Sequence, residues 1–258
     1  MCRWSPTSVA GELLKVTRLA GWLALASPTA PTIILVHGCK ASRTAMLPWV
    51  RYLYAAGYNV LLYDSRGCGE RAGWEIGLGT REPADIVGAV RYLQALGDLR
   101  VKRFAALGVS LGAGAVLLAA AQESALVAVI ADSPWADERP QLARTATVPL
   151  GPLALPLLPY APVLLDALVG TRLDMARPVA AVARIAPRAV MIITSANDAN
   201  ATTLPADQQR IFAAAGEPKI HWIVRQGGHA SARAANPEDY EAVTLAFLAK
   251  YLGAPKTG

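Results

Sequence analysis

Ser110 lies in the motif Gly-x-Ser-x-Gly at residues 108–112, and its surroundings suggest nucleophilic chemistry. An apolar run at 103–109 leads into the serine, and an Ala- and Leu-rich run follows it at 111–122. A strand that turns directly into a helix is the context in which this motif exposes a nucleophile, whereas the pentapeptide alone is equally typical of an ordinary turn. The turn would place the hydroxyl at the helix N-terminus, where the helix dipole favours developing negative charge.

A serine hydroxyl becomes a good nucleophile only when a base takes its proton, and histidine is the usual base. The chain has three histidines, namely His37, His221 and His229. His229 lies in a glycine-rich loop after the last strand-like run, which directs an imidazole towards the carboxyl edge of a parallel sheet. His221 lies inside that run, which favours a structural role. We therefore interpret His229 as the base.

The base needs a carboxylate that fixes its tautomer and stabilises the imidazolium. Asp198 follows the strand-like run 189–194, so the candidate residues occur in the order Ser, Asp, His. Asp132 follows the preceding strand-like run and is the alternative acid, although it can equally cap the turn that begins there. We favour Asp198. We also expect Asp64 to brace its own loop through Arg66.

Hydrophobic runs indicate the elements that must position these residues. Strand-like runs occur at 12–16, 21–26, 32–36, 58–64, 103–109, 126–132, 189–194 and 220–224. Helices are predicted at 45–56, 82–96, 111–122 and 236–252, the last with Asn236 as N-cap and Pro237 at its first position. The alternation predicts an α/β fold with a mostly parallel central sheet and helices on both faces. We expect one domain over residues 1–258, because no linker or repeat interrupts the pattern.

Two apolar segments resemble membrane signals. Residues 15–30 combine two positive charges with a short apolar run, as a secretory signal would, but we favour a strand there. Residues 148–170 contain five prolines and Asp166, which a spanning helix tolerates poorly. We expect instead a small, broken helical cap at about 136–177 over a pocket. The residues expected to line that pocket include Trp135, Leu157 and Tyr160.

The composition narrows the class of protein. Hydrophobic residues make up 53% of the 258 residues, which is enough for a large core. The net charge is +6, but the arginines are scattered singly, so we expect no nucleic-acid partner. The three cysteines, Cys2, Cys39 and Cys68, have no metal-ligand spacing, which predicts a reducing, cytoplasmic location without a metal site. We expect no cofactor and no stable membrane insertion, and none of these features determines the oligomeric state.

The order of these residues resembles the α/β-hydrolase superfamily, and within it bacterial carboxylesterase-like members related to dienelactone hydrolases and prolyl oligopeptidases. The motifs that carry the resemblance are LVHG (35–38), YDSRGCGE (63–70), GVSLGAG (108–114), ADSPWAD (131–137), ND (197–198) and GGHA (227–230). Together they cover about residues 12–252. The resemblance implies an α/β-hydrolase fold with a catalytic triad of Ser110, His229 and Asp198.

The resemblance further implies an oxyanion hole formed by the backbone N–H groups of Cys39 and Leu111, with His37 shaping the loop. The chain departs from the family pattern at Ser195, Cys39 and Glu70, and in the length of the segment 198–205. None of these departures removes a catalytic group.

The expected function is hydrolysis of a small-molecule carboxylic ester of short to medium acyl chain through an acyl-enzyme. One alternative is a lipase for long-chain lipids or monoacylglycerols, and another is an amidase or peptidase with the same triad. A non-catalytic binding protein is the third alternative. It predicts the loss of a triad member, whereas all three are present.

Overall fold

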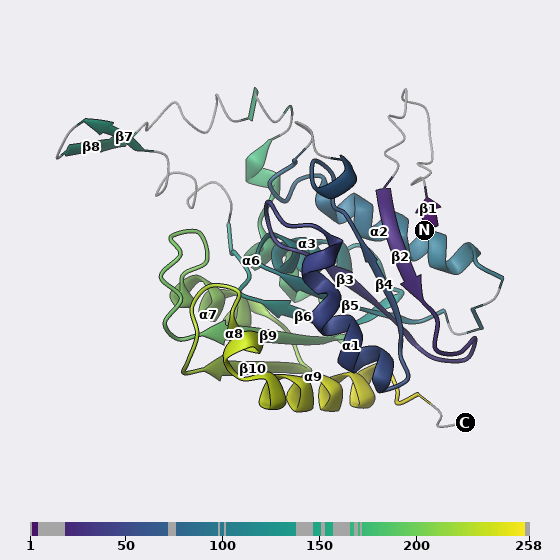
Figure 1. Cartoon of the computed structure of the whole chain (residues 1–258). Helices are drawn as coiled ribbons and strands as arrows, with labels where there is room; N and C mark the ends of the chain where they lie inside the picture. Colours follow the sequence, from purple (N-terminus) through teal and green to yellow (C-terminus); the bar gives the residue numbers. More distant parts are fainter. Residues whose placement is uncertain are drawn as a thin grey trace.

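The structure is a computed structural model that describes residues 2–4, 19–71, 76–97, 99–100, 102–137, 147–150, 153–156, 166–167, 170 and 172–255. Its centre is an eight-stranded sheet with the strand order β1-β2-β4-β3-β5-β6-β9-β10. The pairs β1·β2 and β2·β4 are antiparallel, and the other neighbours in the sheet are parallel. The predicted α/β fold with a mostly parallel sheet is therefore confirmed (Figure 1).

The strands of this sheet agree closely with the hydrophobic runs of the sequence. They are β1 (Cys2–Trp4), β2 (Leu19–Ala24), β3 (Thr32–Val36), β4 (Asn59–Tyr63), β5 (Phe104–Val109), β6 (Leu126–Asp132), β9 (Ala189–Ser195) and β10 (Lys219–Val224). The partner of β2 at the sheet edge is β1, which was not predicted, and the strand expected at 12–16 lies outside the described residues.

Helices cover both faces of the sheet. They are α1 (Leu47–Ala55), α2 (Glu82–Ala95), α3 (Leu111–Ala120), α6 (Pro178–Ala181), α7 (Pro205–Ala214), α8 (Ala232–Ala235) and α9 (Pro237–Tyr251). Short 3-10 helices occur at η1 (Arg43–Met46), η2 (Gly69–Arg71), η3 (Leu173–Met175) and η4 (Val182–Ile185). The helix expected at 45–56 divides into η1 and α1, and α7 was not predicted.

The core consists of two layers separated by the sheet, as the alternation of side chains along β3 shows. Ile34 and Val36 pack with α2, α3 and α7 on one face, whereas Ile33 and Leu35 pack with α1 and α9 on the other. Figure 1 shows α1 and α9 together on one side of the sheet. All five residues of β3 are buried, as expected for a strand inside a sheet that is covered on both faces.

The segment 136–177, expected to form a helical cap, contains both a hairpin and short helical stretches where it is described, the latter at residues 166–167 and at η3 (Leu173–Met175). Residues Thr147–Leu150 (β7) and Leu153–Pro156 (β8) form a two-stranded antiparallel hairpin instead of a broken helix. Proline lacks the backbone donor that a helix interior requires, which is why the proline-rich sequence does not continue as a helix there. In Figure 1 the hairpin stands clear of the eight-stranded sheet.

The start of α9 also differs in one detail from the prediction. Pro237 occupies the first helical turn, and Asn236 is the residue before it, but the Asn236 side chain does not cap the helix. Its amide instead donates to the carbonyl of Ala232 at 3.4 Å, because α8 ends directly against the beginning of α9.

Candidate active site

Ser110 lies at the sharp turn between β5 and α3, at the carboxyl end of the parallel strands. Its φ of 55° and ψ of −117° are strained for a residue with a side chain, as the turn of a nucleophile elbow requires. The close approach of the chain explains the two flanking glycines. A Cβ at Gly108 would lie 2.2 Å from the carbonyl oxygen of Gly112, and a Cβ at Gly112 would lie 2.4 Å from the carbonyl oxygen of Val36.

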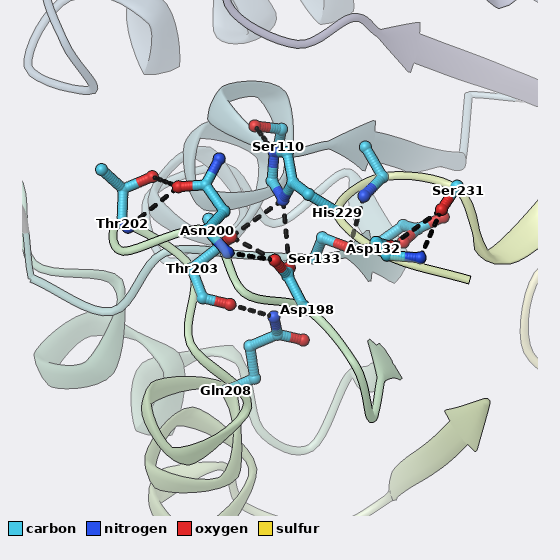
Figure 2. A network of polar contacts seen from close by, with 12 residues as sticks. Ser110, Asp132, Ser133, Asp198, Asn200, Thr202, Thr203, Gln208, His229 and Ser231 are labelled. Atoms are coloured by element: carbon cyan, nitrogen blue, oxygen red, sulfur yellow. Dashed lines mark hydrogen bonds and ion pairs between the residues drawn. The ribbon is translucent and has the colours of Figure 1, made fainter. Parts of the chain in front are cut away.

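The structure brings Ser110, His229 and Asp198 together, although they come from three separate loops (Figure 2). Ser110 Oγ lies 2.9 Å from His229 Nε2, and His229 Nδ1 lies 3.0 Å from Asp198 Oδ2. The carboxylate can only accept, so Nδ1 carries the hydrogen and Nε2 is free to accept the proton of the serine hydroxyl. This is the arrangement that general-base activation of a serine requires.

Asp198 is held as a carboxylate by several donors. Burial alone would raise its pKa, but the hydrogen bonds from His229, from the Asn200 backbone N–H and from Thr203, together with the attraction of His229, lower the pKa below its ordinary value. The Asn200 N–H donates to Oδ1 at 2.9 Å, and the Thr203 hydroxyl donates to Oδ2 at 3.0 Å. The acid is therefore ionised at neutral pH.

Thr203 is a residue of the site that the sequence analysis missed. Its hydroxyl oxygen lies 2.8 Å from His229 Nδ1, so it contacts the base as well as Asp198 (Figure 2). Gln208 fixes the Thr203 carbonyl through an amide hydrogen bond of 2.6 Å. Thr203 lies within the segment 198–205, whose length the sequence analysis noted as a departure from the family pattern.

The alternative acid, Asp132, does not contact His229 directly in the described hydrogen-bond network. Its carboxylate Oδ1 accepts from the Ser133 hydroxyl at 3.1 Å, and its backbone carbonyl accepts from the Ser110 N–H at 2.9 Å. His221 lies on β10. Its Nε2 is 2.9 Å from the Thr194 hydroxyl oxygen, and burial lowers the pKa of its imidazole. His221 thus has a packing role in the sheet.

The loop that contains Cys39 lies beside the serine. A Cβ at Gly38 would lie 3.3 Å from the Ser110 Cβ, so the loop and the elbow are in close contact. His37 Nε2 accepts from the Ser65 N–H at 3.0 Å, so Nδ1 carries the hydrogen and donates to the Gly38 carbonyl at 2.7 Å. Burial lowers the pKa of His37, which keeps this neutral form at physiological pH. The hydrogen bond from His37 orients the peptide group between Gly38 and Cys39, which contains the first expected oxyanion donor, the Cys39 N–H. The second expected donor is the N–H of Leu111, the first residue of α3.

The prediction that Asp64 pairs with Arg66 was wrong. Asp64 is buried and pairs with the Arg43 guanidinium, while its Oδ1 accepts from the Arg43 backbone N–H at 2.7 Å. Arg43 also pairs with Glu70, which explains an acidic residue at a position where the family pattern has a small polar one. Arg66 instead donates to Asp85 on α2 at 2.8 Å. The Arg43 ion pairs join the loop after β3 to the loop after β4, and the Arg66–Asp85 pair joins the loop after β4 to α2.

Trp135 is buried, with 2% of its surface exposed, and its indole N–H donates to the Leu111 carbonyl at 3.2 Å. The role of Trp135 as a pocket wall stays a prediction. The other two expected pocket residues, Leu157 and Tyr160, lie outside the described residues.

An open surface hollow of about 530 Å³ lies between the start of α1 and α8, and Ser110, Asp198 and His229 are not among its lining residues. Its lining residues are Thr44, Leu47, Pro48, Arg51 and Arg233. The first three follow the Cys39 loop along the chain, and Arg233 follows His229 by four residues.

Two further properties concern metals and membranes. In the part of the chain that the structure describes, no group of three or more His, Cys, Asp or Glu side chains is arranged to hold a metal ion. None of the helices among the described residues is both long enough and apolar enough to cross a membrane.

Bacterial proteins of similar sequence are known. Uncharacterized protein YfhR of Escherichia coli O157:H7 is 31% identical over 141 residues, which cover 52% of this chain and 49% of YfhR. Uncharacterized protein YqkD of Bacillus subtilis is 29% identical over 223 residues, which cover 85% of this chain and 72% of YqkD. The match thus spans about half the length of YfhR and a larger share of YqkD.

Solved structures share the fold. Esterase Pf2001 of Pyrococcus furiosus has a TM-score of 0.73 at 22% identity, with 92% of this chain and 88% of that chain covered. The alpha/beta hydrolase GrgF from Penicillium sp. sh18 has a TM-score of 0.72 at 24% identity, with 97% and 99% covered. The model of the Alpha/beta hydrolase family matches residues 33–243. Because this match covers most of the sequence, the chain belongs to the alpha/beta hydrolase family.

Proposed function

We propose that the protein is a serine hydrolase that cleaves carboxylic esters through an acyl-enzyme. The observation that carries the proposal is the continuous hydrogen-bonded series from Ser110 through His229 to Asp198, at 2.9 and 3.0 Å. An ordinary turn serine would not need a strained backbone, an imidazole and a buried carboxylate in this order.

The proposed reaction follows from the donors and acceptors. Ser110 Oγ attacks the ester carbonyl while its proton passes to His229 Nε2, and Asp198 stabilises the imidazolium. The N–H groups of Cys39 and Leu111 would bind the oxyanion, a type of contact whose loss typically lowers kcat by about 10²–10³-fold. The proton then passes to the leaving alkoxide, and water repeats the sequence on the acyl-enzyme to release the acid and restore Ser110.

The substrate proposal is an ester of short to medium acyl chain. Each buried CH₂ contributes about 0.8 kcal/mol until the acyl site is full, and we propose that kcat/KM is highest at about C4 to C8. Two solved neighbours are esterases, namely Pf2001 of Pyrococcus furiosus and the esterase domain of a Rhodothermus marinus protein, and these supply an analogy of fold.

A panel of p-nitrophenyl esters and anilides of increasing acyl length tests the proposal, with Ser110→Ala as the matched control. We expect ester turnover that Ser110→Ala reduces at least about a thousandfold while the fold is retained. Turnover that survives in folded Ser110→Ala would refute the serine mechanism. Greatest activity on long-chain esters at an emulsion surface would indicate a lipase, and preference for anilides would indicate an amidase.

A further inference from the structure

Asp132 is a buried carboxylate that the proposed mechanism does not use. It ends β6 directly beneath the elbow, and none of its surface is exposed. Among the described residues only Oδ1 has a hydrogen bond of ordinary geometry, from Ser133, and the Tyr240 hydroxyl is the other donor close to the carboxylate. A charged group in such a place is costly for stability unless it is fully paired. The position of its neighbours suggests what this charge does.

Ser133 links Asp132 to the loop of the base. The Ser133 hydroxyl donates to Asp132 Oδ1 at 3.1 Å and accepts from the Ala230 N–H at 3.2 Å (Figure 2). Ala230 directly follows His229, so this hydrogen bond fixes the backbone next to the imidazole. Ser133 and Ala230 each have a φ of 54°, which is unfavourable for a residue with a Cβ. The hydrogen bond between them holds both strained residues in place.

The carboxylate is also electrostatically coupled to the base. Burial raises the pKa of Asp132 to about 6, and the hydroxyls of Tyr240 and Ser133 and the attraction of His229 oppose that rise. The charged and titratable groups that face Asp132 are His229 after β10, Asp198 after β9, Tyr240 on α9 and Tyr52 on α1. His229 is the one basic group in this described set. Above pH 6 Asp132 is mostly charged. An imidazolium at His229 would then form beside two carboxylates, those of Asp132 and Asp198.

We propose that Asp132 is a positioning residue for His229, which it supports in two ways. First, through Ser133 it fixes the Ala230 N–H and thereby the backbone conformation next to His229. Second, its charge stabilises the imidazolium that forms when Ser110 gives up its proton. This inference rests on the proposed function for its kinetic part, whereas the contact with Ala230 is independent of any activity.

Two variants separate the two contributions. Asp132→Asn keeps an oxygen that can accept from Ser133 but removes the charge, so kcat/KM at pH 8 should fall about tenfold, the factor that corresponds to one pKa unit. The acid limb of the pH profile should also move to lower pH, since the protonated imidazole loses a neighbouring anion. Ser133→Ala keeps the charge but breaks the link, so kcat should fall while the acid limb stays in place.

Asp137→Asn serves as the control, because Asp137 lies five residues further along the same segment and pairs with Arg177 at 2.9 Å. We expect it to retain the wild-type kcat/KM and pH profile. The proposal is overturned if Asp132→Asn behaves like the wild type at every pH, or if it is as inactive as Ser110→Ala, which would make Asp132 the triad acid.

Amide hydrogen exchange at Ala230 tests the link without any substrate. We expect protection of this N–H in the wild type and in Asp132→Asn, and faster exchange in Ser133→Ala. Equal exchange in all three proteins would refute the positioning role even if the protein is an active esterase. An inactive wild type with the expected exchange pattern would refute the proposed function and leave the contact intact.

Discussion

The Thr203 hydroxyl lies 2.8 Å from Nδ1 of His229, beside the Asp198 carboxylate that contacts the same nitrogen at 3.0 Å. Because the same hydroxyl donates its hydrogen to Asp198 Oδ2 at 3.0 Å, its oxygen is left to accept from the Nδ1–H. The imidazole hydrogen is therefore shared between a carboxylate and a hydroxyl. The base is thereby held in one tautomer by two acceptors from the same loop.

Thr203→Val should lower kcat/KM about 10- to 100-fold, because it replaces the hydroxyl by a methyl group of the same shape and removes a hydrogen bond to a charged group. Thr203→Ser should restore most of the activity. The neighbouring Thr202 provides a control, since its hydroxyl donates to Asn200 Oδ1 at 2.7 Å. Thr202→Val should stay close to the wild type in the same ester assay. Equal activity of the two valine variants would show that Thr203 does not position the base.

Asp198→Asn should lower kcat by about 10⁴-fold with the fold retained, because an amide can donate to Nδ1 and so favours the wrong imidazole tautomer. The measurement is steady-state ester hydrolysis at the pH optimum. Asp207→Asn, on the nearby helix α7, is the control and should remain active, since Asp207 pairs with Arg210 at 3.1 Å. A small effect of Asp198→Asn beside a collapse in Asp132→Asn would reassign the acid.

The parts of this site that the sequence predicted are those that depend on local pattern. Ser110 was proposed from the strand-to-helix turn, and His229 and Asp198 from the loops at the carboxyl ends of strands; the structure brings the three side chains together, and their catalytic roles stay predictions. A continuous apolar run such as 32–36 can be placed correctly because all of its side chains are buried.

The parts that the sequence did not predict depend on tertiary partners. The inward face of α7 carries Asp207, Gln208 and Ile211, which are all buried, so the helix shows no clear apolar stripe. Asp64 was paired with the nearby Arg66, although Arg43 reaches it from another loop. The local sequence pattern does not show which distant side chains the fold brings into contact.

Asp132 predicts a pH dependence of stability. Its pKa is about 6 in the folded protein against an ordinary value of 3.8, so the folded state binds this proton more readily. The free energy of unfolding should therefore fall as the pH rises from about 4 to about 6, by at most about 3 kcal/mol from this group. Above pH 6 the stability should stay at this lower level as far as Asp132 is concerned. Asp132→Asn should unfold at a higher urea concentration than the wild type at pH 8. The difference should shrink at pH 4, and a variant that is less stable at pH 8 would contradict the buried charge as the cause.

Gly114→Ala should destabilise the protein although alanine is the better helix former. The added Cβ would lie 2.1 Å from Cε2 of the Trp135 indole, a rigid ring that is itself buried against Gly79. Overpacking of this kind costs about 1–3 kcal/mol, which exceeds the gain of about 1 kcal/mol from replacing a helical glycine. Gly97→Ala is the matched control, because a Cβ there meets nothing within 4 Å. Urea unfolding should show a lower midpoint for Gly114→Ala and an unchanged or higher midpoint for Gly97→Ala. Since Trp135 donates to the Leu111 carbonyl, we also expect kcat to fall in Gly114→Ala. A stable Gly114→Ala variant with normal kcat would show that the indole can move away without disturbing the turn at Ser110.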